Sequence, residues 1–230
     1  MTRIIIPALL LSFFTVILPG LRAEDYQYQE FKEKKKHVPF ADYIPRIRLH
    51  YETVPHYLED YYELYGFKQY YNENSLRKNI ERLKTALQCK FRHPSRALVK
   101  IESEKEYYKY RNLMFMHLNI LIMRNYMRIA SSYDQQKISF YSAPFAKDIT
   151  DSLEFAEKYY NEALPYWDEA VKYAAVASSV KITTDLGFIE SERKSIMKGD
   201  LDFKKIINGH IAKLKKKRDK LSAMLAKQTK

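Results

Sequence analysis

The chain has 230 residues, with 40 Lys and Arg against 28 Asp and Glu, which leaves a formal net charge of +12. One cysteine excludes an intrachain disulfide, and five glycines leave few of the tight turns that a β-sheet needs. This composition excludes a small disulfide-stabilised fold and favours a helical protein with affinity for anionic surfaces.

The first 23 residues resemble a secretory signal peptide. Arg3 gives a short positive start, residues 4–18 are almost wholly apolar, and Pro19-Gly20 breaks the segment before Ala23. We expect cleavage after Ala23, because the apolar run is short for a membrane span of about 20 residues. An uncleaved anchor is the alternative. Export without disulfides favours a bacterial periplasm, where nucleic acid is a poor partner.

The rest divides into an extended N-terminal arm, residues 24–45, and an elongated helical domain, residues 46–230. The arm carries four lysines within residues 32–36, followed by Pro39 and Pro45. No apolar run after residue 23 is uninterrupted enough to predict a stable membrane span.

The apolar spacing and the capping residues predict four long or short helices between residues 68 and 198. The first is amphipathic over residues 68–91, with the single cysteine, Cys89, near its end. Ser103 and Glu106 form a capping box that opens a helix to about Tyr133. A helix over 145–180 carries a stripe that steps by four and three residues, which is the spacing of coiled-coil packing, and Pro165 lies inside it. A short helix, 186–198, is capped by Thr184 or Asp185 and closed by Gly199.

A last helix is expected over 201–226, capped by Asp200 and strongly basic near its end. Helices of this length in one chain make a rod, a hairpin or an angled body rather than a sphere. We therefore predict an all-α fold, an elongated bundle of long antiparallel helices with coiled-coil-like packing.

A search for chemistry predicts no catalytic residue, no cofactor and no metal site. The glycine-rich nucleotide loops and the histidine–carboxylate motifs of helical metal enzymes are absent from the sequence. His117 is interpreted as a satisfied buried imidazole. A metal site at His50 and His56 is disfavoured because Pro55 interrupts their register. The acidic pairs Asp148 with Asp151 and Glu190 with Glu192 are interpreted as solvated helix faces or caps.

Tyrosine is the positive signal, with 20 in the chain and several in adjacent pairs. Tyrosine is enriched in protein interfaces, and lysines suit an acidic partner, although adjacent tyrosines can equally be core residues. The candidate interface residues are Tyr61, Tyr62, Tyr70, Tyr71, Tyr107, Tyr159, Lys213, Lys216, Lys217 and Lys220.

Five segments resemble the flagellar coiling and sheath proteins of spirochaetes. They are ELYGFKQYY at 63–71, NSLRKNIERLK at 74–84, FRHPS at 91–95 with Ala97-Leu98, YYNEALPYW at 159–167 and IMKGDLDF at 196–203. The resemblance covers about residues 56–215. It implies a periplasmic, all-helical, bent or V-shaped protein that coats the flagellar filament and promotes its coiling and cell motility.

The resemblance implies that the partners are the filament core and other sheath proteins, with self-association left open. A rival interpretation is a periplasmic ligand-binding or chaperone-like module. In that reading Met114, Met116, Met123 and Met127 line an adaptable groove between helices. An exposed methionine groove would favour the rival, and a filled helical hairpin would favour the sheath protein.

Overall fold

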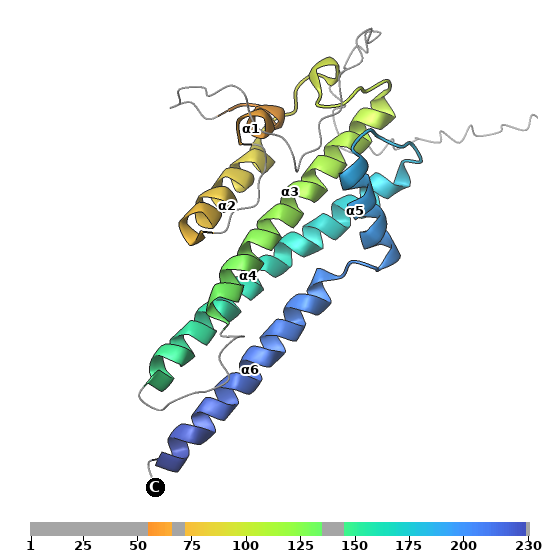
Figure 1. The fold of residues 1–230 in the computed structure, drawn as a ribbon. Coiled ribbons are helices and arrows are strands. Elements are labelled where there is room, and N and C mark those ends of the chain that lie inside the picture. The colour runs from red at the N-terminus through yellow and green to blue at the C-terminus, as the bar shows by residue number, and fades with distance from the viewer. Residues whose placement is uncertain (1–54, 66–71, 135–144, 229–230) are drawn as a thin grey trace, which may run out of the picture.

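The computed structural model describes residues 55–65, 72–134 and 145–228, and this part of the chain forms six α-helices and no β-strand. In order these are α1 (Leu58–Tyr65), α2 (Glu73–Gln88), α3 (Glu104–Tyr133), α4 (Ala146–Ser179), α5 (Gly187–Lys198) and α6 (Phe203–Gln228). Figure 1 shows α3, α4 and α6 lying side by side as an elongated bundle, with α1 and α2 along one flank and α5 at one end. The predicted all-α, elongated architecture is confirmed. The signal segment 1–23 and the arm 24–45 lie outside the described residues.

The antiparallel pair of α3 and α4 forms the centre of the core. On α4 the predicted stripe is buried, and its small residues Ala156, Ala163 and Ala170 are fully inaccessible to solvent. Alanines at the contact let two helix backbones approach closely, and the four-and-three spacing keeps the stripe facing its neighbour over the whole length. Helix α4 continues through Pro165.

Helix α3 begins where the capping box predicts. The Ser103 hydroxyl accepts a hydrogen bond from the backbone N–H of Glu106 at 3.2 Å. The Glu106 carboxylate reaches back to the N–H of Glu102 at 2.7 Å, one residue earlier than the reciprocal bond that the motif predicts. Both bonds satisfy N–H groups that have no partner within the helix.

Helix α2 packs antiparallel on α3 through Leu76, Ile80 and Leu83. It begins at Glu73 rather than at 68, because Asn72 caps it by accepting from the N–H of Asn74. Cys89 is its C-cap rather than a residue within the helix, and this partly buried thiol packs against the core.

Helix α6 runs antiparallel to α4 and buries Ile207, Leu214 and Leu221. Asp202, rather than the predicted Asp200, caps it, since its carboxylate accepts from the N–H of Lys205. The charged residue within the apolar stripe, Arg218, pairs with Glu157 of α4 at 2.5 Å.

The turn before α6 requires a residue with a left-handed backbone conformation. Gly199 has φ of 79° and ends α5 as predicted. The start of α5 differs from the prediction, because Leu186 occupies the N-cap position and no side chain caps the helix. The Thr184 hydroxyl instead contacts the buried Glu190 carboxylate.

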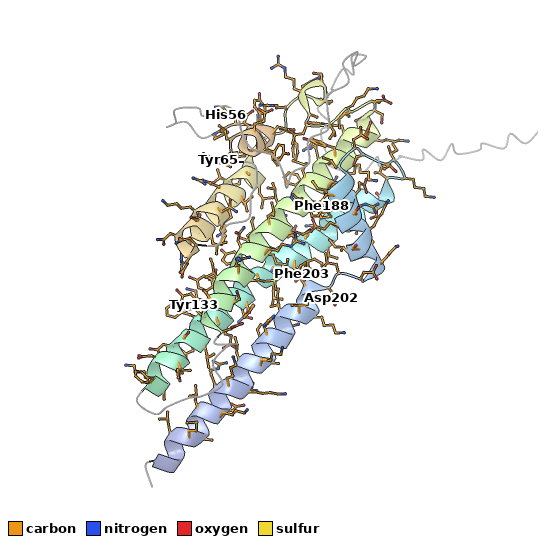
Figure 2. The ribbon with its side chains drawn as sticks, viewed as in Figure 1. His56, Tyr65, Tyr133, Phe188, Asp202 and Phe203 are labelled. Carbon is orange, nitrogen blue, oxygen red and sulfur yellow. The ribbon has the colours of Figure 1, made fainter. Side chains whose placement is uncertain are left out.

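None of the described helices has the length and apolar character needed to cross a membrane. The side chains fill the space between the helices, as Figure 2 shows for Phe203 at the start of α6. The Phe203 ring packs edge-on against Trp167 of α4, with 5.4 Å between the two ring centres.

Candidate interaction surfaces

The outer face of α6 carries a line of lysines. At 3.6 residues per turn, Lys205, Lys213, Lys216 and Lys220 fall within about a quarter of the helix circumference, roughly opposite the buried face. All four are exposed, and none has an ion-pair partner among the described residues. Their backbone positions extend over about 22 Å of helix. We call these four residues the lysine face.

Two of the structure's findings change the predicted lysine set. Lys217 does not belong to the lysine face, because its ammonium donates to the backbone carbonyl of Asp134 at 2.6 Å. Burial lowers the pKa of Lys217 from its usual value. Lys205 was missed, although its eight-residue separation from Lys213 was a readable signal of a shared helix face.

The predicted interface tyrosines that the structure describes are core residues. Tyr61, Tyr62, Tyr107 and Tyr159 are between 1% and 6% exposed, so their rings offer a partner little area. Tyr70 and Tyr71 lie outside the described residues.

Adjacent tyrosines are buried together where a helix is covered on two sides. The Tyr159 ring lies beside Tyr126 of α3, whereas the Tyr160 hydroxyl donates to Asp134 at 2.9 Å and its ring stacks on His210 of α6. The pair at 107–108 divides differently, since Tyr107 is buried and Tyr108 is 51% exposed.

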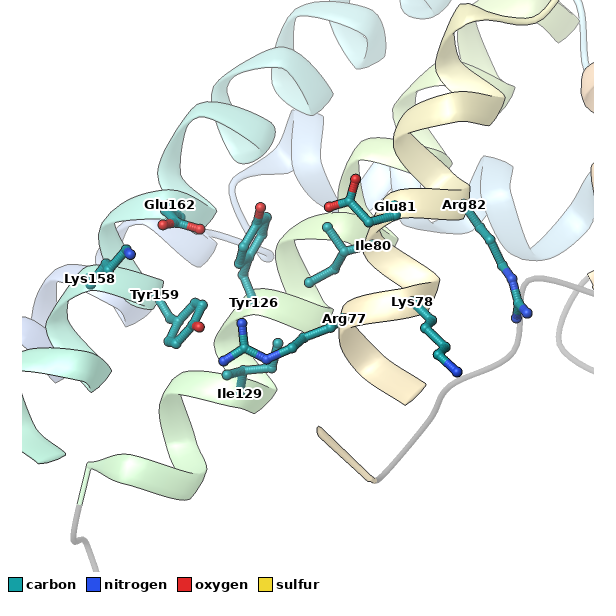
Figure 3. A pocket seen from close by; sticks show the side chains of 10 residues that line it. All are labelled: Arg77, Lys78, Ile80, Glu81, Arg82, Tyr126, Ile129, Lys158, Tyr159 and Glu162. Carbon is teal, nitrogen blue, oxygen red and sulfur yellow. The ribbon is translucent and has the colours of Figure 1, made fainter. Parts of the chain in front are cut away.

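An open cleft of about 500 Å³ lies between α2 and α4, with α3 as its floor. Figure 3 shows its charged side chains: Arg77 and Glu81 of α2 and Lys158 and Glu162 of α4 lie beside Tyr126 and Tyr159, whereas Lys78 and Arg82 of α2 point away from these rings. The floor is apolar and aromatic. Beside Tyr126 and Ile129 of α3 it includes Ile80 of α2 and Tyr159 of α4, and all four are at most 7% exposed.

Cations of α2 hold the cleft's tyrosines in place. The Arg77 guanidinium lies 5.1 Å from the ring centre of Tyr159, and the Lys84 ammonium lies 5.6 Å from that of Tyr126. The hydrogen bond with the Tyr126 hydroxyl raises the pKa of Lys84 well above its usual value, so this ammonium stays charged. These contacts link α2 to both central helices.

A buried charged cluster joins α3 to α5, and this corrects the prediction that Glu190 and Glu192 are solvated or capping residues. Glu190 is 3% exposed and pairs with Lys109 of α3 and with Arg193, both at 2.7 Å. Burial acts to raise the pKa of Glu190, but the hydrogen bonds from Lys109 and Arg193 outweigh it, so the pKa lies below its usual value.

Glu192 forms the second half of the cluster. Its carboxylate lies 3.2 Å from Nδ1 of His117 and 2.7 Å from the guanidinium of Arg124. Burial alone would raise its pKa, but the contacts with His117 and Arg124 lower it overall. The prediction of a satisfied, buried His117 is confirmed, since its ring is 4% exposed and paired. Phe188, labelled in Figure 2, covers this ring edge-on.

The sequence contained a signal for this cluster. Lys109, His117 and Arg124 step by eight and seven residues, which places three basic groups on one face of a helix that is mostly apolar at its centre. Such a face needs acidic partners when it is buried. The other acidic pair, Asp148 with Asp151, is exposed as predicted.

The methionines of the rival interpretation lie in the core. Met114, Met116 and Met123 are at most 1% exposed, and Met127 is partly buried against the core. The helical hairpin is therefore filled, and no methionine groove lies between α3 and α4. No group of three or more His, Cys, Asp or Glu residues in the described ranges could hold a metal ion, and His50 lies outside those ranges.

Comparison with known proteins gives one match. A family model whose description is domain of unknown function (DUF8513) matches residues 105–224, from the start of α3 to near the end of α6. No curated protein and no solved structure matches the chain. The matched region contains the central helices, the buried cluster and the lysine face.

Proposed function

Because the chain belongs to the family described as a domain of unknown function (DUF8513), which carries no activity with it, we propose a function from the sequence and the surface. The protein is a non-enzymatic structural component of a periplasmic flagellar filament sheath. It binds the filament core and neighbouring sheath proteins, and so promotes filament coiling and motility. The segments that resemble spirochaete coiling and sheath proteins, and the predicted signal peptide, support this identity and location.

The lysine face is the observation that carries the proposal. Four exposed lysines on one side of a long helix form a linear cationic surface, which suits repeated contact with an acidic filament. The long helices behind it are held by a continuous core, so the surface is presented by a stiff body. Such a subunit, repeated along a filament, fixes an angle at each contact, and these angles accumulate into curvature.

The ligand-binding alternative loses the feature that suggested it. Its methionines are core residues, and filling a core is their ordinary role. The filled hairpin favours the sheath interpretation over a groove between α3 and α4.

Co-sedimentation of residues 24–230 with purified periplasmic filaments tests the proposal. We expect saturable binding that weakens as salt rises, because exposed charges are screened over about 10 Å at 0.1 M ionic strength. Changing Lys205, Lys213, Lys216 and Lys220 together to Gln should remove most of this binding.

A matched variant separates the effect of the lysine face on binding from the effect of net charge. Changing Lys90, Lys105, Lys147 and Lys181 to Gln removes the same charge from exposed positions outside α6, and this variant should bind like the parent. Absence of binding by the parent protein, with candidate sheath partners also present, would refute the sheath function. Equal loss in both variants would refute the assignment of the contact to α6.

A further inference from the structure

The two walls of the α2–α4 cleft have the same direction and the same charge order. Helices α2 and α4 both run antiparallel to α3, so they run parallel to each other. On α2, Arg77 is followed four residues later by Glu81. On α4, Lys158 is followed four residues later by Glu162. Four residues of helix rise about 6 Å, so each wall has a cation and a carboxylate one turn apart.

Contacts across the cleft show that the walls are in register. Arg77 lies over Tyr159, the neighbour of Lys158, and about two turns further along both helices the Tyr126 ring contacts Lys84 of α2 and Tyr166 of α4. In Figure 3 Arg77 and Lys158 flank Tyr159, while Glu81 and Glu162 lie on either side of Tyr126. The cleft therefore has a cationic end at Arg77 and Lys158, and an opposite end where the carboxylates of Glu81 and Glu162 outnumber the ammonium of Lys84.

The charges on the α4 wall are not used within the fold. Lys158 and Glu162 have no ion-pair partner among the described residues, in keeping with the weaker coupling of a basic residue that precedes an acidic one at this spacing. On the α2 wall, Arg77 bonds Glu73 at 2.6 Å, and Glu81 lies 3.6 Å from Lys84. Both of these pairs are solvent-accessible, so each residue keeps a side open to the cleft.

We propose that this cleft binds an amphipathic helix of a partner protein that carries Glu and Lys four residues apart. The partner's Glu lies at the Arg77–Lys158 end, and its Lys lies at the Glu81–Glu162 end. An apolar side chain on the same face of the partner rests on the narrow exposed strip of the floor at Tyr126 and Tyr159, since both rings are largely buried.

A helix fits this arrangement because its own rise sets the same separation. Two side chains four residues apart lie on one face about 6 Å apart along the axis, which matches the charge spacing of both walls. A helix laid in a groove between two others is also a common mode of peptide recognition. This site lies on the face of α4 opposite α6, and the inference does not depend on the proposed filament contact.

A synthetic peptide tests the site without a filament. The probe is an alanine-based helical peptide with Glu, Leu three residues later and Lys four residues later, and the control peptide has Gln in place of both charges. By fluorescence anisotropy at low salt, we expect the charged peptide to bind saturably and about tenfold more tightly than the Gln peptide, with the difference lost at high salt.

A charge exchange in the protein tests the register of the walls. Lys158→Glu with Glu162→Lys reverses one wall while net charge and helix composition stay constant, so each charge of the peptide then faces one attractive and one repulsive group. We expect about a tenfold loss of affinity. The matched control, Glu169→Lys with Lys172→Glu, exchanges another exposed pair of α4 and should leave binding unchanged.

Circular dichroism should show the same helicity for the parent and both exchange variants. A loss of binding can then be assigned to the exchanged charges rather than to unfolding. The inference would be overturned by equal affinity for the charged and Gln peptides, or by equal affinity of the Lys158–Glu162 exchange variant and the parent. Absence of saturable binding up to millimolar peptide would overturn it as well.

Discussion

Removing the carboxylate of Glu190 should destabilise the protein more than removing that of Glu192. The change Glu190→Gln leaves Lys109 without its anionic partner, at a position where the Lys109 side chain is only 4% exposed. Among the described residues, Lys109 would keep its hydrogen bond to the backbone carbonyl of Ile182. A buried ammonium without a counter-charge costs about 3–5 kcal/mol, which is a large part of the stability of a typical domain.

The change Glu192→Gln has milder consequences because its partners can adapt. Arg124 keeps 28% of its side chain exposed and can be hydrated, and the other partner, His117, is an imidazole rather than an ammonium. We therefore expect a loss of about 2 kcal/mol, the usual range for a hydrogen bond to a charged group. The predicted order follows from the exposure of the cation that each carboxylate leaves behind.

Guanidinium unfolding followed by far-UV circular dichroism measures both losses, and a double variant tests their origin. Lys109→Met removes the stranded cation with little change in volume. In the background of Glu190→Gln it should therefore recover at least about 2 kcal/mol, whereas in the parent protein it should be destabilising.

Additive losses in the Lys109–Glu190 cycle would refute the reasoning, since they would show that the two charges do not stabilise each other. A larger loss for Glu192→Gln than for Glu190→Gln would refute the argument from exposure. The slope of free energy against denaturant should be the same in all variants, which keeps the comparison within one unfolding transition.

Two further predictions concern pH and the turn before α6. Because the pKa values of Glu190 and Glu192 lie below their usual 4.5, the pair contributes stability that is complete above that pH and is lost as pH falls below it, so the urea midpoint should fall in this range. The double variant Glu190→Gln, Glu192→Gln should show a smaller acid loss, and an unchanged one would contradict the assignment. Gly199→Ala should lower thermal stability by about 1–2 kcal/mol because φ is 79° there, and an unchanged melting temperature would contradict this.

The long helices could be predicted because their packing repeats locally. The four-and-three stripe of α4 and the capping box at Ser103 gave the extents of α3 and α4 to within one or two residues. Several caps could not be assigned, because Asp200 and Asp202 are equally good cap residues and the tertiary position of the turn decides between them.

The distinction between surface and interior was harder to predict for polar residues. Tyr61 and Tyr159 suit an interface or a core equally well, and only the number of neighbouring helices decides. Glu190 and Glu192 lie on a short helix whose polar sequence by itself predicts solvated side chains. Their burial depends on basic residues of α3 that are about 70–80 positions away in the sequence. That pairing could be seen only once α5 was placed against α3.

The two proposed surfaces lie on opposite sides of the bundle, the lysine face on the outer side of α6 and the cleft on the side of α4 that faces α2. On α4, Glu157 and Asp168 face α6, through Arg218 and Lys204, whereas Lys158 and Glu162 face the cleft. A partner on the lysine face and a partner helix in the cleft would therefore be separated by a packed core rather than by a flexible joint. The angle between the two partners would then be set by helix packing. A subunit that fixes such an angle at every repeat can convert a straight assembly into a curved one.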